Sequence, residues 1–254
     1  MKIETNNTLR KSLTNIFKHF KSISEEMVVF FEEDKICLGT VDKAMVGMSR
    51  VEIKSDPLMD VGILDSQEFE EFEGKAVQIR ADKVYSFLKT FEENLTIDIQ
   101  EDQVELRNDN NFFKLPVLEN GSDGYSDLVD EGINLQNENK VVLSRKKLSE
   151  VVKKTGLISK AFDIEGDGLN ISFKAEDSKY RTKISFSDED VQEMSISEFR
   201  SKFSIEYFKK MVFKGFSTFS LWMGSDRPVV LMADREGEVI QIKLKNVVAP
   251  RVEE

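Results

Sequence analysis

Lysine and arginine are the residues of this chain whose spacing most clearly indicates a chemistry. Sixteen of the 36 lie in four segments of helical periodicity that hold only five acidic residues, so these segments carry +11 and the rest of the chain −22. A basic surface on an acidic protein indicates a localised binding site for a polyanion, and the acidic remainder disfavours nucleic acid elsewhere. The four segments are residues 8–23, 80–93, 144–160 and 204–215.

Candidate residues for catalysis or metal binding are few. The only histidine, His19, lies between basic residues of a predicted helix, so a Ser-His-Asp arrangement lacks its carboxylate. One His and one Cys cannot supply the usual ligand set of a zinc site. Residues 163–168 open like a calcium-binding loop, but Lys174 stands at the twelfth position, where a bidentate Glu is required. We therefore predict a hairpin turn there, and expect no enzymatic activity, metal or cofactor.

Composition and length favour a globular protein. With 254 residues, 40% hydrophobic and 33% charged, the chain is long enough for one large core or two domains. No apolar run approaches the roughly 18 residues that span a membrane, and the N-terminus has no signal-peptide core. The single cysteine, Cys37, lies in an apolar run and is expected to be buried. A chain without disulfides indicates a reducing compartment.

The chain is predicted to contain two copies of one unit. Residues 10–13 (Arg-Lys-Ser-Leu) align with 145–148 (Arg-Lys-Lys-Leu), and a strand and helix at 77–93 match 194–215. The matches keep one order, helix, strands, helix, strands, which is typical of a duplication. Between the copies, residues 119–127 are rich in Gly, Ser and Asp and indicate a surface connector.

Alternating or β-rich runs predict many short strands, so we expect an α+β protein with two helices in each copy. The predicted domains are residues 1–117 and 135–254, joined by a connector at 118–134. The strand signals lie at 27–32, 49–53, 103–107, 111–117, 140–143, 180–186, 229–233 and 238–244.

The predicted helices pair an apolar stripe with a basic face. In 8–23 the apolar residues recur at helical spacing, and in 144–160 the basic residues lie opposite the apolar ones. Ser144 is a good N-cap, but Arg145, Lys146 and Lys147 follow it at the positive end of the helix dipole, which is unfavourable. A face that served only solubility would mix both signs, so we favour a polyanion-binding surface over a merely solvated one.

Several local motifs, in this order, resemble the proliferating cell nuclear antigen (PCNA) family of sliding clamps. Residues 41–46 (Val-Asp-Lys-Ala-Met-Val) are similar to the family's Asp-x-x-His-Val loop, with Met45 in place of His. Residues 133–135 and 140–143 look like the end of its interdomain connector and the entry strand of its second domain, and 226–230 like a Pro-containing turn. The ending 247–254 (Val-Val-Ala-Pro-Arg-Val-Glu-Glu) is close to the family's Leu-Ala-Pro-Lys/Arg-Val/Ile-Glu. The resemblance covers the whole chain.

This resemblance implies two tandem clamp domains, with helices on an inner face and antiparallel sheets outside, in a trimeric ring around duplex DNA. Phosphate contacts by Lys and Arg carry no sequence information, so binding is expected to be non-specific and salt-sensitive. The residues expected to face DNA are Arg10, Lys11, Lys18, Lys21, Lys83, Lys89, Arg145, Lys146, Lys147, Lys153, Lys154, Lys209, Lys210 and Lys214.

The resemblance also implies a pocket for aromatic-bearing peptides of partner proteins, under the connector and beside the C-terminal tail. Carried over by position, its walls are Val41, Leu128, Val129, Ile133, Pro228, Val247, Ala249 and Pro250. Val247 stands where many relatives have Tyr, and Asn134 where some have Pro, so the shape of the pocket differs from theirs.

Two strand edges are predicted to join subunits head to tail: 111–117 in the first copy and 180–187 in the second. Pairing one edge with the other gives a heterologous contact that can close into a ring. The apolar residues expected to support this contact are Phe112, Phe113, Tyr180 and Ile184.

The favoured function is a DNA-polymerase processivity factor in replication and repair, a homotrimer that binds double-stranded DNA, DNA polymerase, a clamp loader and other peptide-bearing partners. The alternatives are a subunit of a heterotrimeric or checkpoint-type clamp, a basic nucleic-acid-binding module that is not a ring, and, least favoured, an acidic α+β enzyme. The expected location is the cytoplasm, with the nucleoid, in an archaeon, or the nucleus in a eukaryote.

Overall fold

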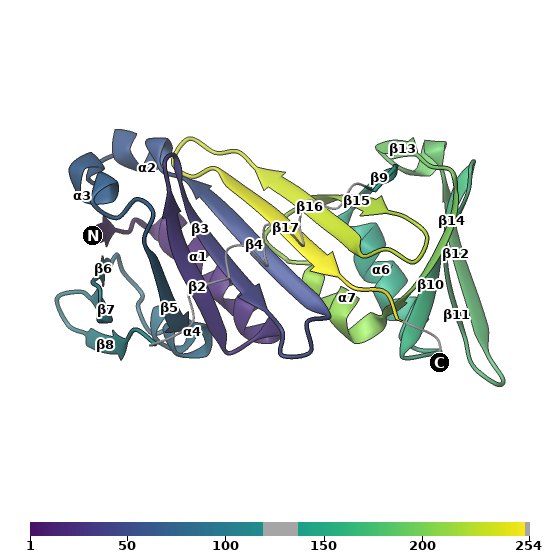
Figure 1. Cartoon of the computed structure of the whole chain (residues 1–254), viewed down its shortest axis with the longest axis horizontal. Helices are drawn as coiled ribbons and strands as arrows, with labels where there is room; N and C mark the ends of the chain where they lie inside the picture. The colour runs from purple at the N-terminus through teal and green to yellow at the C-terminus, as the bar shows by residue number, and fades with distance from the viewer. Residues whose placement is uncertain (119–136, 252–254) are drawn as a thin grey trace. The chain divides into compact units, whose positions relative to one another are not determined.

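The computed structural model describes residues 1–118 and 137–251, which divide into two compact units (Figure 1). The first unit holds the described residues of Met1–Val41, Ser49–Asp130 and Asp234–Leu244, and the second those of Asp42–Met48, Glu131–Ala233 and Lys245–Glu254. The predicted domains are each continuous in sequence, whereas each unit also contains a short segment from the other half of the chain. Hydrogen bonds hold these segments within their units: Lys54 N–H donates to Gln241 O (3.1 Å) in the first, and Ala249 N–H to Val46 O (2.8 Å) in the second.

Residues 1–118, the described part of the first half, form twelve elements. They are β1 (Lys2–Glu4), α1 (Asn7–Ile23), β2 (Glu26–Glu32), β3 (Lys35–Val41), β4 (Gly47–Lys54), α2 (Asp56–Asp60), α3 (Ser66–Glu70), β5 (Ala76–Arg80), α4 (Ala81–Leu88), β6 (Thr96–Ile99), β7 (Gln103–Arg107) and β8 (Phe112–Pro116).

The second half runs from a strand that follows the connector to the C-terminal strand. Its elements are β9 (Asn139–Ser144), α6 (Arg145–Thr155), β10 (Ala161–Asp167), β11 (Asn170–Glu176), β12 (Arg181–Ser187), a 3₁₀ turn (Asp188–Asp190), β13 (Glu193–Ser195), β14 (Glu198–Ser204), α7 (Ile205–Met211), β15 (Thr218–Met223), β16 (Val229–Arg235) and β17 (Ile242–Val248).

The strand orders show that the two halves share one topology. The order β1-β6-β7-β8 in the first half corresponds to β9-β15-β16-β17 in the second, and β4-β3-β2-β5 corresponds to β12-β11-β10-β14. In each half one helix follows the first strand: α1 follows β1, and α6 follows β9. A second helix follows the corresponding strands β5 and β14: α4 follows β5, and α7 follows β14. The predicted α+β fold and the duplicated order are confirmed.

The helices form where capping and an apolar stripe agree. Asn6 caps α1 by accepting a hydrogen bond from Leu9 N–H (2.8 Å), and Ser144 caps α6 by accepting one from Lys147 N–H (3.3 Å). The predicted apolar stripes face the core. Their buried members are Leu9, Leu13, Ile16, Phe17 and Phe20 in α1, and Leu148, Val151 and Val152 in α6.

The structure differs from the predicted helices in two respects. Helices α4, α6 and α7 end at Leu88, Thr155 and Met211, so the chain beyond them, which carries Lys89, Lys160 and Lys214, is not helical. The first half also contains α2 and α3, five residues each, which the sequence did not predict. Asp65 caps α3 by accepting a hydrogen bond from Glu68 N–H (3.0 Å).

The two residues that were candidates for chemistry are structural. Cys37 is buried, as predicted, and burial raises the pKa of its thiol far above the usual value. His19 is buried, with its Nε2 2.9 Å from Ser49 Oγ. The predicted hairpin turn at 163–168 is wrong in its position, because residues 163–167 belong to strand β10 and only Gly168, at φ 85°, lies in the turn between β10 and β11. No helix in the described part of the chain is long and apolar enough to cross a membrane.

Candidate nucleic-acid surface and partner pocket

Helices α6 and α7 line a basic groove in the second unit, with a volume of about 1000 Å³. Four residues predicted to face DNA meet there, Arg145 and Lys153 from α6 with Lys209 and Lys214 from α7 and its following turn. Lys160 and Arg251 join them, and were not among the predicted site residues. The groove contains one acidic residue, Glu206, which pairs with Lys210 (3.2 Å). Six cations around one groove form a surface suited to a polyanion.

Some cations of the second unit already have intramolecular partners. Lys147 Nζ donates to the Asp190 carbonyl and lies 5.4 Å from the centre of the Phe186 ring. Lys154 pairs with Glu150 one turn earlier on α6 (2.6 Å). Because these cations are partly neutralised or held in place, they are weaker candidates for phosphate contacts than Lys153 and Lys209, which are exposed.

In the first unit the predicted cations gather where α1 and α4 pack together. Lys11, Lys18 and Lys83 are exposed. Lys21 and Lys89 approach the same ring, that of Tyr85, at 4.3 and 5.8 Å from its centre. These contacts gather cations from α1 and from the turn after α4 around one aromatic side chain, which holds them close together.

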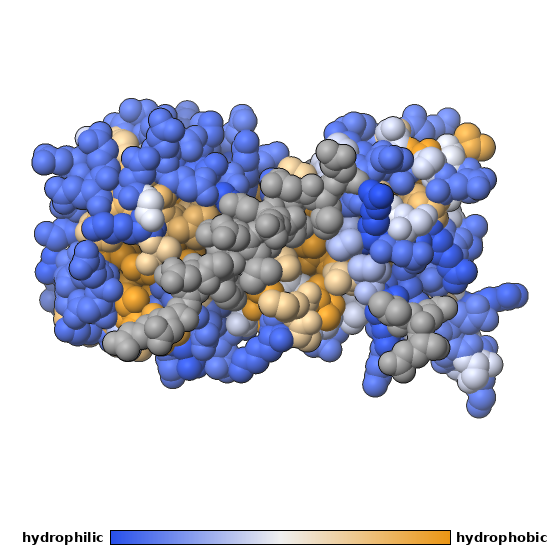
Figure 2. All heavy atoms as spheres, viewed as in Figure 1, coloured by the Kyte–Doolittle hydropathy of each residue, from blue (hydrophilic) through white to orange (hydrophobic). Residues whose placement is uncertain are grey.

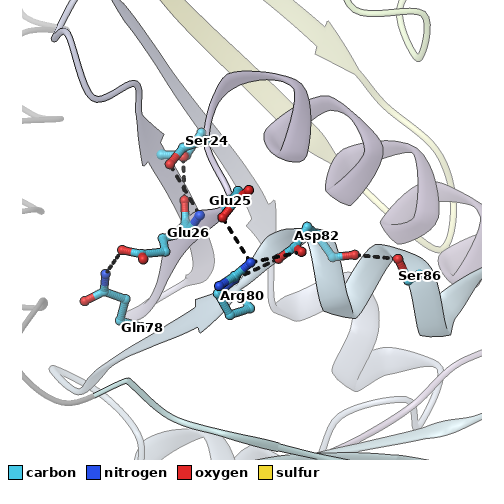
Figure 3. Close-up of polar contacts among 8 residues, drawn as sticks. Ser24, Glu25, Glu26, Gln78, Arg80, Asp82 and Ser86 are labelled. Atoms are coloured by element: carbon cyan, nitrogen blue, oxygen red, sulfur yellow. Dashed lines mark hydrogen bonds and ion pairs between the residues drawn. The ribbon is translucent and has the colours of Figure 1, made fainter.

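Two arginines of this unit serve the fold. Arg10 is half-buried and donates to the Phe91 carbonyl (2.6 Å) and to Asn7 Oδ1 (3.0 Å), so its predicted role as a DNA contact is not supported by its position. Arg80, immediately before α4, contacts Asp82 (2.9 Å) and Glu25 (3.0 Å) (Figure 3). The two carboxylates neutralise this guanidinium, so the basic surface begins after it.

Asp42 organises the turn that was expected to border the partner pocket. Its carboxylate accepts hydrogen bonds from Val46 N–H and Gly47 N–H (2.7 Å each), Ala44 N–H (3.1 Å) and the Tyr207 hydroxyl (2.8 Å). Burial raises the pKa of this carboxyl, but the hydrogen bonds, from Gly47 first, outweigh burial and hold the pKa below its usual value.

The turn held by Asp42 presents two apolar side chains that the sequence-based pocket omitted. Met45 is 58% exposed and has a positive φ of 54°, and Val46 is partly exposed. The sequence did contain a signal for these two residues, because both belong to the 41–46 loop motif, in which Met45 replaces the family's His. Ala249 N–H donates to Val46 O (2.8 Å), so the C-terminal tail runs beside this turn.

The predicted pocket residues divide into three groups. Pro228, Ala249 and Pro250 are partly exposed and available to a ligand. Val41 and Val247 are buried at 7% and 5% exposure, so they support the fold beneath the surface and do not form exposed walls. Leu128, Val129 and Ile133, with the rest of the predicted connector after residue 118 and up to 134, lie outside the described residues.

A second cavity lies where the tail meets β14. Arg251 N–H donates to the Lys202 carbonyl (2.7 Å), and Pro250 and Arg251 border a cavity of about 450 Å³. Its other lining residues are polar or charged: Asp163, Arg200, Ser201, Lys202, Ser225 and Asp226. The tail thus lies between a small apolar surface and a polar cavity that is lined by both cations and carboxylates.

The two predicted subunit edges lie at sheet ends. β8 ends the order β1-β6-β7-β8, and β12 ends the order β12-β11-β10-β14. Phe112 and Tyr180 are 59% and 64% exposed, as an interface requires. Phe113 instead stacks on Phe87 (4.2 Å between ring centres) within its own unit.

Hydrophilic residues cover most of the surface of each unit on the face shown in Figure 2.

Comparison with solved structures identifies the fold. The chain superposes along its full length on A. fulgidus PCNA, determined with the C-terminal region of FEN-1 bound (TM-score 0.77, 17% identity, 100% of this chain and 99% of the other). It is also similar to the PCNA2–PCNA3 complex of Sulfolobus tokodaii (0.70, 16%, 100% of each chain) and to PCNA from Entamoeba histolytica (0.76, 14%, 99% and 98%). No known family model matches the sequence, and no curated protein does.

The chain therefore has the sliding-clamp fold of archaeal and eukaryotic PCNA, with two clamp domains. Identities of 14–17% establish the fold and leave the roles of individual residues to be argued from this structure.

Proposed function

We propose that this chain is a non-catalytic subunit of a ring-shaped DNA sliding clamp of three subunits. The ring encircles duplex DNA and tethers a DNA polymerase and other replication and repair proteins. The observation that carries the proposal is the six-cation groove between α6 and α7, on helices that the resemblance to PCNA clamps implies would face the central hole.

Non-specific phosphate contacts suit this function. Lys and Arg on these helices bind backbone phosphates without reading bases, so the subunit is free to move along the duplex. Encirclement then provides retention, and the electrostatic contacts need only be weak and salt-dependent.

The fold comparison also supports a docking role. The A. fulgidus clamp was determined with the C-terminal region of FEN-1. In this chain the apolar surface made by Met45, Val46, Ala249 and Pro250 lies beside the C-terminal tail. An extended partner peptide could place apolar side chains here while its backbone pairs with the tail.

Retention on DNA of different topology tests the proposal. The assembled protein, loaded on nicked circular DNA by a clamp loader, should remain bound in high salt and leave once the circle is linearised. Replacing Lys153 and Lys209 by Glu should lower duplex affinity roughly tenfold or more and reduce the salt dependence of binding by about two phosphate contacts. The matched control, Lys54→Glu with Lys243→Glu, changes the same charge at exposed positions on β4 and β17.

Equal retention on circular and linear DNA would favour the competing function, a basic nucleic-acid-binding module that does not form a ring. Equal loss of affinity in the control pair would show that net charge, and not the groove, governs binding.

A further inference from the structure

Among the strands that end a sheet in the described part of the chain, β8 and β12 each have one unpaired edge that could accept another strand. β8 is paired only with β7, and β12 only with β11. An unpaired edge exposes N–H and C=O groups that a neighbouring strand can bind. Both edges are therefore candidates for subunit contacts in the proposed ring.

Each edge strand has an apolar side continuous with its own core. On β8, Leu115 is buried and Phe113 contacts Phe87 and Phe91, at 4.2 and 5.6 Å between ring centres. On β12, Phe186 lies 6.1 Å from Phe173, with the rings nearly perpendicular. A strand added at either edge could extend these apolar layers, which favours association.

The opposite side of both strands is basic. The only charged residue of β8 is Lys114, and the only charged residues of β12 are Arg181 and Lys183. All three are exposed and alternate with the inward apolar residues, so they share the outward side of their sheets.

Neighbouring strands compensate these charges unevenly. Glu105 on β7 lies opposite Lys114, and Glu176 on β11 lies opposite Arg181. Lys183 instead lies opposite Lys174, which is itself paired with Glu165. Lys183 is therefore the least compensated cation on either edge.

Pairing β8 of one copy with β12 of another would place like charges together in three of the four outward alignments, all except Lys114 opposite Ser187. If Lys114 lies opposite Arg181 or Lys183, two cations face each other directly. If it lies opposite Ser185, it is diagonal to Lys183, still a neighbouring position. These alignments repel in both strand directions, since the outward residues alternate in the same way.

We propose that β8 and β12 bind the edge strands of a different clamp chain, one with Asp or Glu at the outward positions, and not a second copy of this chain. This inference rests on the proposed ring and specifies its composition: the three subunits are not identical. The complex of two different clamp chains in Sulfolobus tokodaii gives a structural precedent for such pairing.

A charge-reversal cycle supplies the test without the natural partner. Lys114→Glu makes the β8 edge acidic, and Arg181→Glu together with Lys183→Glu makes the β12 edge acidic, so each of these one-edge variants has a self-complementary pair of edges. Combining all three replacements gives two acidic edges, which repel each other as the two basic edges of the unmodified chain do. Sedimentation velocity should show the unmodified chain and the combined variant as mostly monomeric at micromolar concentration. Each one-edge variant, and an equimolar mixture of unmodified chain and combined variant, should associate roughly tenfold more tightly.

Lys243→Glu on β17 is the matched control, because it changes the same charge at an exposed position away from either edge, and it should not change the mass. Thermal melting should show all variants folded, since the replaced side chains are exposed. A stable trimer of the unmodified chain alone would overturn the inference. The inference would also fail if all the charge-reversed variants and the equimolar mixture remained monomeric. If that homotrimer is retained on circular DNA, the proposed clamp function stands while this inference fails.

Discussion

At the scale of the residue, Asp42 connects the fold to the partner surface. Its carboxylate accepts four hydrogen bonds, three from backbone N–H groups of one turn and one from Tyr207. A single side chain thus fixes the positions of Met45 and Val46. The lowered pKa of Asp42 reflects the preference of these donors for the ionised form.

We expect Asp42→Asn to destabilise the protein by roughly 1–3 kcal/mol at neutral pH, because buried N–H groups lose a charged acceptor. The pKa of Asp42 is lower in the folded than in the unfolded state, so its contribution is fully present above about pH 4. The contribution is lost as the pH falls through the folded-state pKa. Urea unfolding at pH 7 and pH 3 should therefore show a gap between the proteins that narrows in acid. Tyr207→Phe, which removes one donor, should cost less.

A gap of the same size at both pH values would show that the charge of Asp42 does not stabilise the turn. The hydrogen bonds would then act only through their geometry.

At the scale of the element, two glycines close together in sequence have different structural roles. The sequence assigned both Gly166 and Gly168 to turn chemistry. Only Gly168 is in the turn, with φ 85°, whereas Gly166 is on β10 opposite Phe199 of β14. A Cβ at Gly166 would lie 2.5 Å from the Phe199 ring and 2.7 Å from the Ser197 carbonyl oxygen.

Gly166→Ala should therefore destabilise the second unit by roughly 1–3 kcal/mol, because a backbone carbonyl cannot give way as a flexible side chain can. Gly168→Asn should cost much less, because Asn tolerates the left-handed region and a Cβ at Gly168 would meet nothing within 4 Å. Chemical denaturation of the two variants would compare them directly, and equal costs would contradict the packing argument.

The elements also show what the sequence could predict. Periodicity predicted α1 and α6, with Ser144 as the N-cap of α6, and internal sequence matches predicted the common order of both halves, because these signals are local or extend over many residues. Helices α2 and α3 are five residues long, too short for a helical period to register. The engagement of Arg10 with the Phe91 carbonyl depends on a residue 81 positions away. Such pairings arise only from tertiary structure, so charge patterns overestimate the number of free cations.

At the scale of the whole molecule, the proposed surfaces for DNA and for partner proteins adjoin each other. The cationic groove uses α6 and α7 and also reaches Val46 and Arg251, while the docking surface uses the 42–48 turn and the C-terminal tail. Replacing Lys153 and Lys209 should therefore weaken duplex binding and leave peptide docking intact, whereas a change in the tail can affect both. The structure also shows where the tail can be cut, because Val248 is fully buried but Ala249 and Pro250 are partly exposed.

Truncation after Val248 should abolish binding of a short peptide with one aliphatic and two adjacent aromatic residues. The cut removes the Ala249–Val46 and Arg251–Lys202 backbone hydrogen bonds and the exposed apolar side chains beside them. Little buried apolar surface is lost, so the melting temperature should fall by only a few degrees. Calorimetry on the intact and truncated proteins measures peptide affinity. Because the cut also removes Arg251, a cation of the groove, duplex binding of the truncated protein is compared with that of full-length Arg251→Ala. A truncated protein that binds the peptide as well as the intact one would place the docking surface elsewhere. Loss of peptide binding together with a larger loss of duplex affinity than Arg251→Ala causes would instead show that the tail supports the fold of the second unit, including its cationic groove.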